Sequence, residues 1–185
     1  MTILPRRTFM VGAGSLTLLA ACNNGVGANG GQRIDARVDA TLDYLYSRYP
    51  GTTDLRDKAA GILVMPLVTK AGLGIGGSYG RGALRVQGAT VDYYSATSGT
   101  VGLQIGAQQY AHTLFFMTNE ALQRFRRSPG WAAGADVEYT LNENGENLSA
   151  ETTTAQSPVI ALIFGQAGLI AGATLKGTKY TRIIP

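Results

Sequence analysis

Residues 61–86 read GILVMPLVTKAGLGIGGSYGRGALRV, and this stretch decides the fold. Its first part, residues 61–68, is a continuous apolar run of strand length, in which Pro66 indicates an edge or a bulge. Its second part, residues 72–86, is predicted to be another strand and has glycines at alternate positions. Because glycine has no Cβ, such positions permit tight curvature or the close approach of another backbone. The glycines in question are Gly72, Gly74, Gly76, Gly80 and Gly82.

The rest of the chain after residue 33 has mainly the pattern of strands, with about three helices. The helices are predicted over residues 34–49, 54–60 and 119–127, the last with Thr118 or Asn119 as its cap. Further strands are predicted over residues 90–95, 100–108, 110–117, 137–141, 158–165, 169–175 and 179–184, with a hairpin turn at Asn144-Gly145. The predicted fold class is therefore α+β and strand-dominated: a strongly curved, Gly-rich antiparallel sheet or a partly closed barrel.

The first residues have the order of a secretory signal. Arg6 and Arg7 precede an apolar run, residues 9–21, which ends in small residues and is shorter than the ~20 residues of a spanning helix. The run ends Leu-Ala-Ala-Cys, which resembles a bacterial lipobox. Cys22 is therefore predicted to become the first residue of the mature chain and to carry lipid, a diacylglyceryl thioether with a further acyl chain such as palmitate.

The export route and the destination have weaker signals. Arg6-Arg7 followed by Thr-Phe-Met resembles a twin-arginine export signal, although the general secretory route stays open. Asn23 and not Asp follows Cys22, which by resemblance to enterobacterial lipoprotein sorting favours the outer membrane, facing the periplasm. The predicted organisation is a cleaved signal peptide over residues 1–21, a flexible Gly/Asn-rich tether over residues 22–33 and one domain over residues 34–185.

Composition narrows the classes of function. The chain has 185 residues, 25 of them Gly, and 15% are charged, whereas the usual shares are roughly 7% for Gly and ~25% for charge. One Cys and one His exclude an intrachain disulfide and a multi-Cys or His-rich metal site, and no cofactor is expected. Without Arg6 and Arg7, the 16 basic residues become 14 against 12 acidic residues, so the net charge of +4 becomes +2. Such a near-neutral body does not favour nucleic acid as a partner.

One glycine motif matches a nucleotide-binding pattern. Residues 72–77, GLGIGG, satisfy G-x-G-x-x-G after a strand, and Asp92 lies twenty residues after Gly72. The mechanism of that motif needs a helix that begins at the third glycine and faces the pyrophosphate. The following residues, Tyr79 to Gly82, are poor helix formers, so glycines of a curved strand are the favoured interpretation.

A second motif matches a hydrolase pattern. Residues 76–80 satisfy G-x-S-x-G around Ser78, and Asp92 and His112 follow in the order of a catalytic triad. A nucleophile elbow, however, is a strand-to-helix turn in a fold of alternating strands and helices, and that pattern is missing here. His112 alternates with apolar residues as a structural strand residue does. We therefore expect no catalytic residues and no enzyme.

Basic residues form loose groups in the sequence, and a face that gathers three or four of them would attract anionic lipid. The candidate lipid-binding residues are Lys70, Arg81, Arg85, Arg124, Arg126, Arg127, Lys176, Lys179 and Arg182. In the predicted helix over residues 34–49, by contrast, Asp35, Asp39 and Asp43 oppose Arg37 and Arg48. This balance favours packing of the helix on the sheet over binding to an anionic membrane.

Four segments carry a family likeness. They are KAAGILVMPLVTKAGLGIGGSYGRGAL, VDYYSATSGTVGLQIGAQ, FFMTNEALQRFRRSPGWAAGAD and PVIALIFGQAGLIAGATLKGTKYTRIIP. In this order, from about Asp54 to Pro185, they resemble the SYLF lipid-binding domain, whose eukaryotic members include yeast actin-patch regulators. The resemblance implies binding of phosphoinositides or other anionic phospholipids, and in some members of actin. Bacterial members are typically exported proteins, many of them lipoproteins.

Two functional hypotheses follow. The first is a lipid-anchored, non-enzymatic envelope protein whose domain binds phospholipid head groups. The second is a structural or interaction protein of the bacterial cell envelope that binds a protein partner or itself.

Overall fold

A long two-stranded ribbon dominates the computed structural model, which describes residues 29–134, 139–141, 157–165, 168–169 and 175–185. β1 (Gly61–Val86) and β2 (Ala89–Phe116) pair antiparallel along their whole length. The turn between them, Gln87-Gly88, has positive φ at both residues, 51° and 81°, which matches the twist of a two-residue hairpin turn. The predicted strands over residues 61–68 and 72–86 are thus one strand, and those between residues 90 and 117 form the second.

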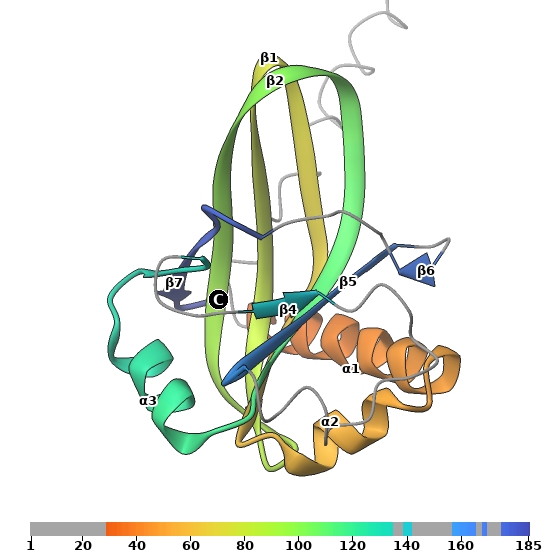
Figure 1. Cartoon of the computed structure of the whole chain (residues 1–185), viewed down its shortest axis with the longest axis vertical. Coiled ribbons are helices and arrows are strands. Elements are labelled where there is room, and N and C mark those ends of the chain that lie inside the picture. The colour runs from red at the N-terminus through yellow and green to blue at the C-terminus, as the bar shows by residue number, and fades with distance from the viewer. Residues whose placement is uncertain (1–28, 135–138, 142–156, 166–167, 170–174) are drawn as a thin grey trace, which may run out of the picture.

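The ribbon doubles over at its glycine-rich middle (Figure 1). A Cβ on Gly72 would collide with the Cα of Gly76 at the bend. A Cβ on Gly82 would overlap the carbonyl oxygen of Val64 and lie 2.7 Å from the Met65 Sδ. The second half of β1 therefore lies against the backbone of its first half, as the alternate glycines predicted.

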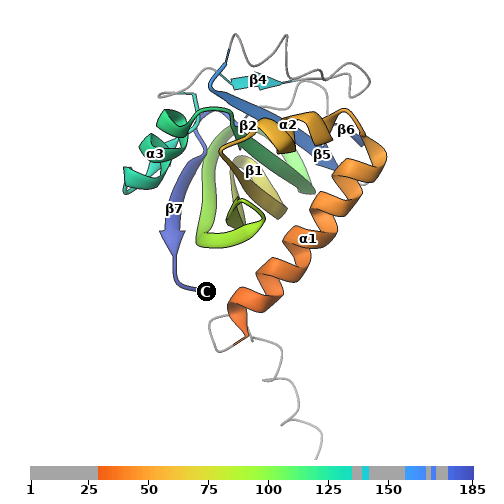
Figure 2. The same cartoon turned by 90° about the horizontal axis from the view of Figure 1, so that it is seen from below.

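The remaining strands extend the sheet from β2. β5 (Val159–Gly165) pairs with residues 111–116 of β2, and β7 (Lys179–Ile183) pairs with residues 93–97. The short strands are β3 (Trp131–Ala132) beside β7, and β4 (Tyr139–Leu141) and β6 (Gly168–Leu169) beside β5. The seven described strands make one sheet that curls into a half-barrel (Figures 1 and 2), with β4–β5 its parallel pair. This confirms the predicted α+β, strand-dominated curved sheet.

Three helices occur in the described part of the chain: α1 (Gly30–Arg48), α2 (Thr52–Lys58) and α3 (Asn119–Arg127). α1 begins four residues earlier than predicted, so residues 30–33 of the expected tether are helical. The reason is tertiary packing, since Gly30 is buried and Gly31 lies against the Tyr93 ring, which outweighs the poor helix propensity of glycine. Thr118 caps α3, as expected: its Oγ1 accepts a hydrogen bond from the Ala121 N–H at 3.1 Å.

The apolar run at the start of β1 is buried on both faces. Ile62 and Val64 belong to a core under α1 and α2, while Leu63 and Met65 belong to a second core inside the curled sheet. This inner core holds an aromatic cluster of α3 and neighbouring strands, including Phe125 and Trp131 with ring centroids 5.4 Å apart. Because strand residues alternate between faces, one apolar run supports both cores.

Several predictions concern residues outside the described ranges. These are Arg6, Arg7 and Cys22 of the export and lipidation signal, the Asn144-Gly145 hairpin, and residues 170–174 of the strand predicted over 169–175.

The contact between the halves of β1 generates a stability prediction. Gly82→Ala places a methyl group against the Val64 carbonyl, and overpacking of this kind costs about 1–3 kcal/mol of the free energy of unfolding. Gly99→Ala is the matched control, because a Cβ there meets no atom within 4 Å and the residue does not have positive φ. Urea denaturation should show a clear loss for Gly82→Ala and a change within about 0.5 kcal/mol for Gly99→Ala. Equal stability of the two variants would contradict the close contact.

Candidate functional site

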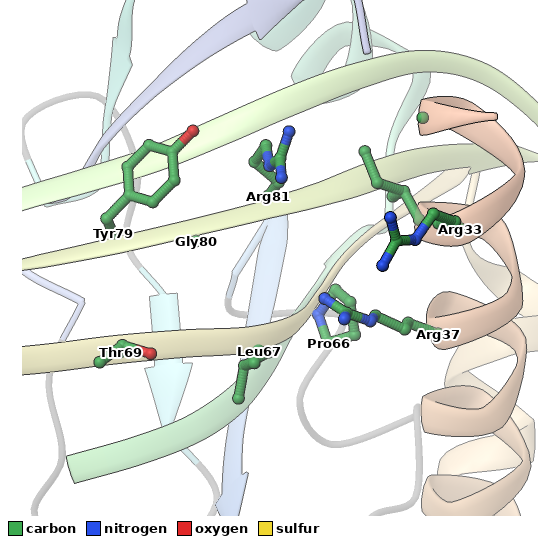
Figure 3. Close-up of a pocket in the computed structure, with 10 residues that line it drawn as sticks. Arg33, Arg37, Pro66, Leu67, Thr69, Tyr79, Gly80 and Arg81 are labelled. Atoms are coloured by element: carbon green, nitrogen blue, oxygen red, sulfur yellow. The ribbon is translucent and has the colours of Figure 1, made fainter. Parts of the chain in front are cut away.

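Three arginine side chains border a pocket between the first turns of α1 and the ribbon (Figure 3). Arg33 and Arg37 come from α1, and because they are four residues apart they lie on one face of the helix. Arg81 comes from the second half of β1. The pocket has a volume of about 250 Å³, and Leu67 and Tyr79 of β1 complete its lining with apolar and aromatic surface.

The electrostatics of this pocket favour an anion. Among the described residues, no carboxylate lies within ion-pair distance of Arg37 or Arg81. Gly30, the first residue of α1, also lines the pocket, and the first turn contains no acidic residue. The N–H groups of a helix N-terminus carry partial positive charge, which adds to that of the guanidinium groups. The pocket can therefore hold a phosphate or carboxylate group.

Two acidic residues of α1, Asp35 and Asp39, contact a different part of the ribbon. Asp35 accepts hydrogen bonds from the Thr90 hydroxyl at 2.7 Å and the Tyr93 hydroxyl at 2.8 Å, and Asp39 forms an ion pair with Arg85. Partial burial and the hydrogen bond to Asp35 raise the pKa of Tyr93. These contacts fix α1 to the sheet, as the charge balance of the helix predicted. They also leave the face with Arg33 and Arg37 for the pocket.

Two of the predicted lipid-binding residues near the glycine stretch lie outside this pocket. Arg85 has 15% of its side chain exposed, and it pairs with Asp39, lies 3.8 Å from Asp35 and donates to the Gly88 carbonyl at 3.1 Å. It connects α1 to the end of the ribbon and does not present a free cation there. Lys70 lies in β1, opposite Gln108 of β2, one residue beyond the pocket-lining Thr69.

The other predicted residues lie near α3 and β7, on the opposite side of the sheet from α1 (Figures 1 and 2). Arg126 and Arg182 both pair with Asp92, at 3.0 and 3.3 Å, and the Asp92 side chain is only 12% exposed. Lys176 and Lys179 pack beside Gly134 and Gly130. Arg124 and Arg127 line a shallow depression on the surface of α3. The nine predicted residues therefore do not share one face.

Sequence reasoning missed Arg33 and Arg37. Arg33 belongs to the segment that was predicted to be a flexible tether. Arg37 was counted only as a charge that balances the acidic residues of its own helix. The four-residue spacing of the two arginines, Arg33 and Arg37, is the signal that could have found them.

The three residues of the hydrolase pattern have separate partners. The Ser78 hydroxyl lies 2.7 Å from the Ser98 hydroxyl, Asp92 binds Arg126 and Arg182, and His112 Nε2 lies 2.8 Å from the Tyr180 hydroxyl. Burial lowers the pKa of His112 to about 3, so its ring is neutral near pH 7. The G-x-G-x-x-G residues lie within β1 and no helix follows them there, as the curved-strand interpretation expected.

Two absences hold for the described residues. Within these ranges no group of three or more His, Cys, Asp or Glu residues could hold a metal ion. Of the helices α1, α2 and α3, none has both the length and the hydrophobicity to cross a bilayer.

Comparison with known families supports the likeness seen in the sequence. Residues 97–182 match the Ysc84 family, described as Las17-binding protein actin regulator. Over these residues, just under half of the chain, the sequence is similar to this family. The match to Ysc84, the SYLF family, confirms the resemblance and supports a lipid-binding or interaction domain. It covers most of β2 and the elements from α3 to β7, whereas the pocket residues of α1 and β1 precede it. A comparison with curated proteins found no match.

The buried His112 generates a prediction about pH. Its folded pKa of about 3 lies below the unfolded value of 6.5, so between these values the unfolded chain binds one proton more. Stability from this group is complete above pH 6.5 and falls as pH is lowered, by about 1.4 kcal/mol per pH unit.

The measurement is urea denaturation of the parent chain and of His112→Gln at pH 7 and pH 5. The parent should lose about 2 kcal/mol more than the variant over this range, whatever the variant's own stability at pH 7. An equal pH dependence of the two chains, or an imidazole NMR signal that titrates near pH 6 in the folded protein, would contradict the burial of a neutral ring.

Proposed function

We propose that this protein is a lipid-anchored, non-enzymatic protein of the bacterial cell envelope whose domain binds the head groups of anionic phospholipids. The observation that carries the proposal is the convergence of Arg33, Arg37 and Arg81 on one pocket at the N-terminal end of α1. The family match supports the coarser part, a lipid-binding or interaction domain. The choice of phospholipid as the ligand, the lipid anchor and the location in the envelope are parts of the proposal that go beyond the family match.

A phosphate group suits the pocket chemically. Guanidinium groups bind phosphate oxygens through two parallel hydrogen bonds, and these charge-assisted bonds are stronger than neutral ones. A pocket of about 250 Å³ has room for a phosphate and part of a head group, while the acyl chains would stay outside. Leu67 and Tyr79, which are 38% and 53% exposed, offer apolar surface beside the charges. The lining therefore fits an amphiphile better than a free inorganic ion.

The predicted anchor lies close to this pocket along the chain. Cys22 precedes Gly30 by eight residues, which span at most roughly 29 Å when fully extended. A lipid on Cys22 would therefore keep the pocket near the head groups, and a weak intrinsic affinity would suffice at that effective concentration. Export by the signal over residues 1–21, with Arg6 and Arg7, and residence at the outer membrane facing the periplasm complete the proposal.

A second candidate function is binding of a protein partner in the envelope. The family's description names binding of the protein Las17, which favours an interaction surface in place of, or beside, a lipid site. A complex recovered from envelopes that persists at high salt would favour this candidate, because salt screens an arginine-phosphate contact.

The pocket is tested by vesicle flotation of the chain from residue 23, which lacks the lipid. The parent should float with vesicles rich in phosphatidylglycerol and only weakly with phosphatidylcholine vesicles. Arg37→Gln combined with Arg81→Gln should weaken binding about tenfold or more, at roughly 1 kcal/mol for each cation near an anionic surface. Arg124→Gln combined with Arg127→Gln removes the same charge from α3 and should have little effect.

Two results would contradict the proposed site. One is an equal loss of binding in both double variants, which would indicate a general effect of net charge. The other is an absence of binding to either kind of vesicle by the parent chain.

The anchor is tested by mass spectrometry of the protein purified from its native envelope. We expect an N-terminal peptide that begins at Cys22 and carries the mass of a diacylglyceryl group, with further acylation. Cys22→Ser should prevent this modification and leave the precursor uncleaved. An unmodified thiol on a freely diffusing protein would contradict the anchor, but it would not decide the lipid affinity of the domain.

A further inference from the structure

The doubled end of the ribbon is an uncharged part of the described chain. Residues 71–80 of β1 and residues 96–107 of β2, which pair with them, contain no charged residue. We call these paired residues the ribbon tip. Figure 1 shows the ribbon tip at one end of the long axis of the molecule, with the helices toward the other end.

The register shows how the ribbon tip bends. From Gly72 to Gly74 the pairing advances two residues on β1, but on β2 it advances four residues, from Gly106 to Gly102. β2 therefore runs around the outside of the bend, and the extra residues form a bulge there. The bend is therefore built into the backbone pairing.

The ribbon tip exposes the apolar side chain of Ile75. Ile75, opposite Val101 of β2, is 78% exposed, and Tyr79, farther along the same strand, is 53% exposed. Both kinds of residue are expected at a membrane surface, since aliphatic side chains enter the acyl boundary and tyrosine keeps its hydroxyl among the head groups. Lys70 and Arg81 immediately flank residues 71–80 on β1. Long cationic side chains at the edge of an uncharged segment can reach phosphates while their stems stay apolar.

The described acidic residues lie outside the ribbon tip. The described carboxylates lie on the helices or at Asp92, which is paired with Arg126 and Arg182. They are Asp35, Asp39, Asp43, Asp54, Asp57, Asp92 and Glu120. An anionic bilayer would therefore meet no carboxylate of the described chain at the ribbon tip.

We infer that the ribbon tip inserts into the outer part of the bilayer, with Ile75 entering the acyl boundary while the three-arginine pocket holds a lipid phosphate. This inference rests on the proposed function and adds a second, apolar contact to it. Ile75 is four residues from Tyr79 of the pocket, about 13 Å along the strand. Interfacial elements enter the membrane by roughly 5–10 Å, so a tilted ribbon can satisfy both contacts at once.

The depth of Ile75 can be measured directly on the lipid-anchored chain. Because the chain has one Cys, which the proposed lipid would occupy, Ile75→Cys introduces a single free thiol that can carry a polarity-sensitive NBD label. In vesicles of phosphatidylglycerol and phosphatidylethanolamine, the label should emit several-fold more strongly than in detergent-free buffer. Lipids that carry a quencher on the acyl chain should abolish this increase. Val91→Cys is the matched control, because Val91 is 40% exposed on β2 outside the ribbon tip, and its label should remain in water.

A second measurement uses the chain from residue 23 without lipid. Ile75→Ser should weaken its binding to the same vesicles about tenfold, and Val91→Ser should bind as the parent does. Serine adds no charge, so repulsion by anionic lipid cannot explain a loss. Thermal unfolding of both variants should show midpoints close to that of the parent, because both positions are exposed.

The outcomes distinguish insertion of the ribbon tip from phosphate binding in the three-arginine pocket. If a label at residue 75 stays in water and Ile75→Ser binds like the parent, the insertion of the ribbon tip is wrong, even if the Arg37 and Arg81 variants lose binding. If the label enters the bilayer but those arginine variants bind normally, the pocket is wrong and insertion stands. If the parent chain does not bind vesicles and the label on the anchored chain remains in water, both the insertion of the ribbon tip and the lipid-binding pocket are wrong.

Discussion

The backbone contact between the two halves of β1 is the constraint on which the rest of the structure depends. Where Gly82 lies against Val64, any side chain larger than hydrogen would push the halves of the strand apart. Because the two halves of the strand touch, the first apolar residues of β1 are buried on both faces of the ribbon. One face encloses the aromatic cluster around Phe125, and the other provides the surface on which α1 and α2 pack. A single close approach thus creates two cores from one strand.

The packing of α1 in turn decides where its charges go. Asp35 and Asp39 are bound by Thr90, Tyr93 and Arg85 of the ribbon, so these two carboxylates attach the helix to the sheet. The arginines one turn apart then face the remaining gap beside Arg81. The net charge of the helix is a poor guide to what it presents to a ligand, because opposite charges are sorted onto different sides by the tertiary fold.

The fold class could be predicted from the sequence because its signals are local: apolar runs, alternate glycines and helical spacing each lie within a few residues. The continuity of β1 through Pro66 and the glycines could not, because bulges absorb irregularities that look like strand ends in the sequence. The candidate site was predicted only in part. Arg81 was named, but Arg85, Arg126 and Arg182 proved to bind carboxylates between 34 and 90 residues away. Such ion pairs follow from the tertiary fold, and no local sequence pattern predicts them.

The family match begins at residue 97, yet the matched segment depends on residues before it. β2 pairs with β1 along its whole length, and the inner core takes Leu63, Met65 and Leu84 from β1. Without these residues, β2 would lose its hydrogen-bonding partner on one side, and the aromatic cluster would lose one wall. The cooperative unit therefore includes β1, and α1 joins it through the contacts of Asp35 and Asp39. Since the three arginines stand on these two elements, the geometry of the pocket is maintained by the same packing that holds the matched region together.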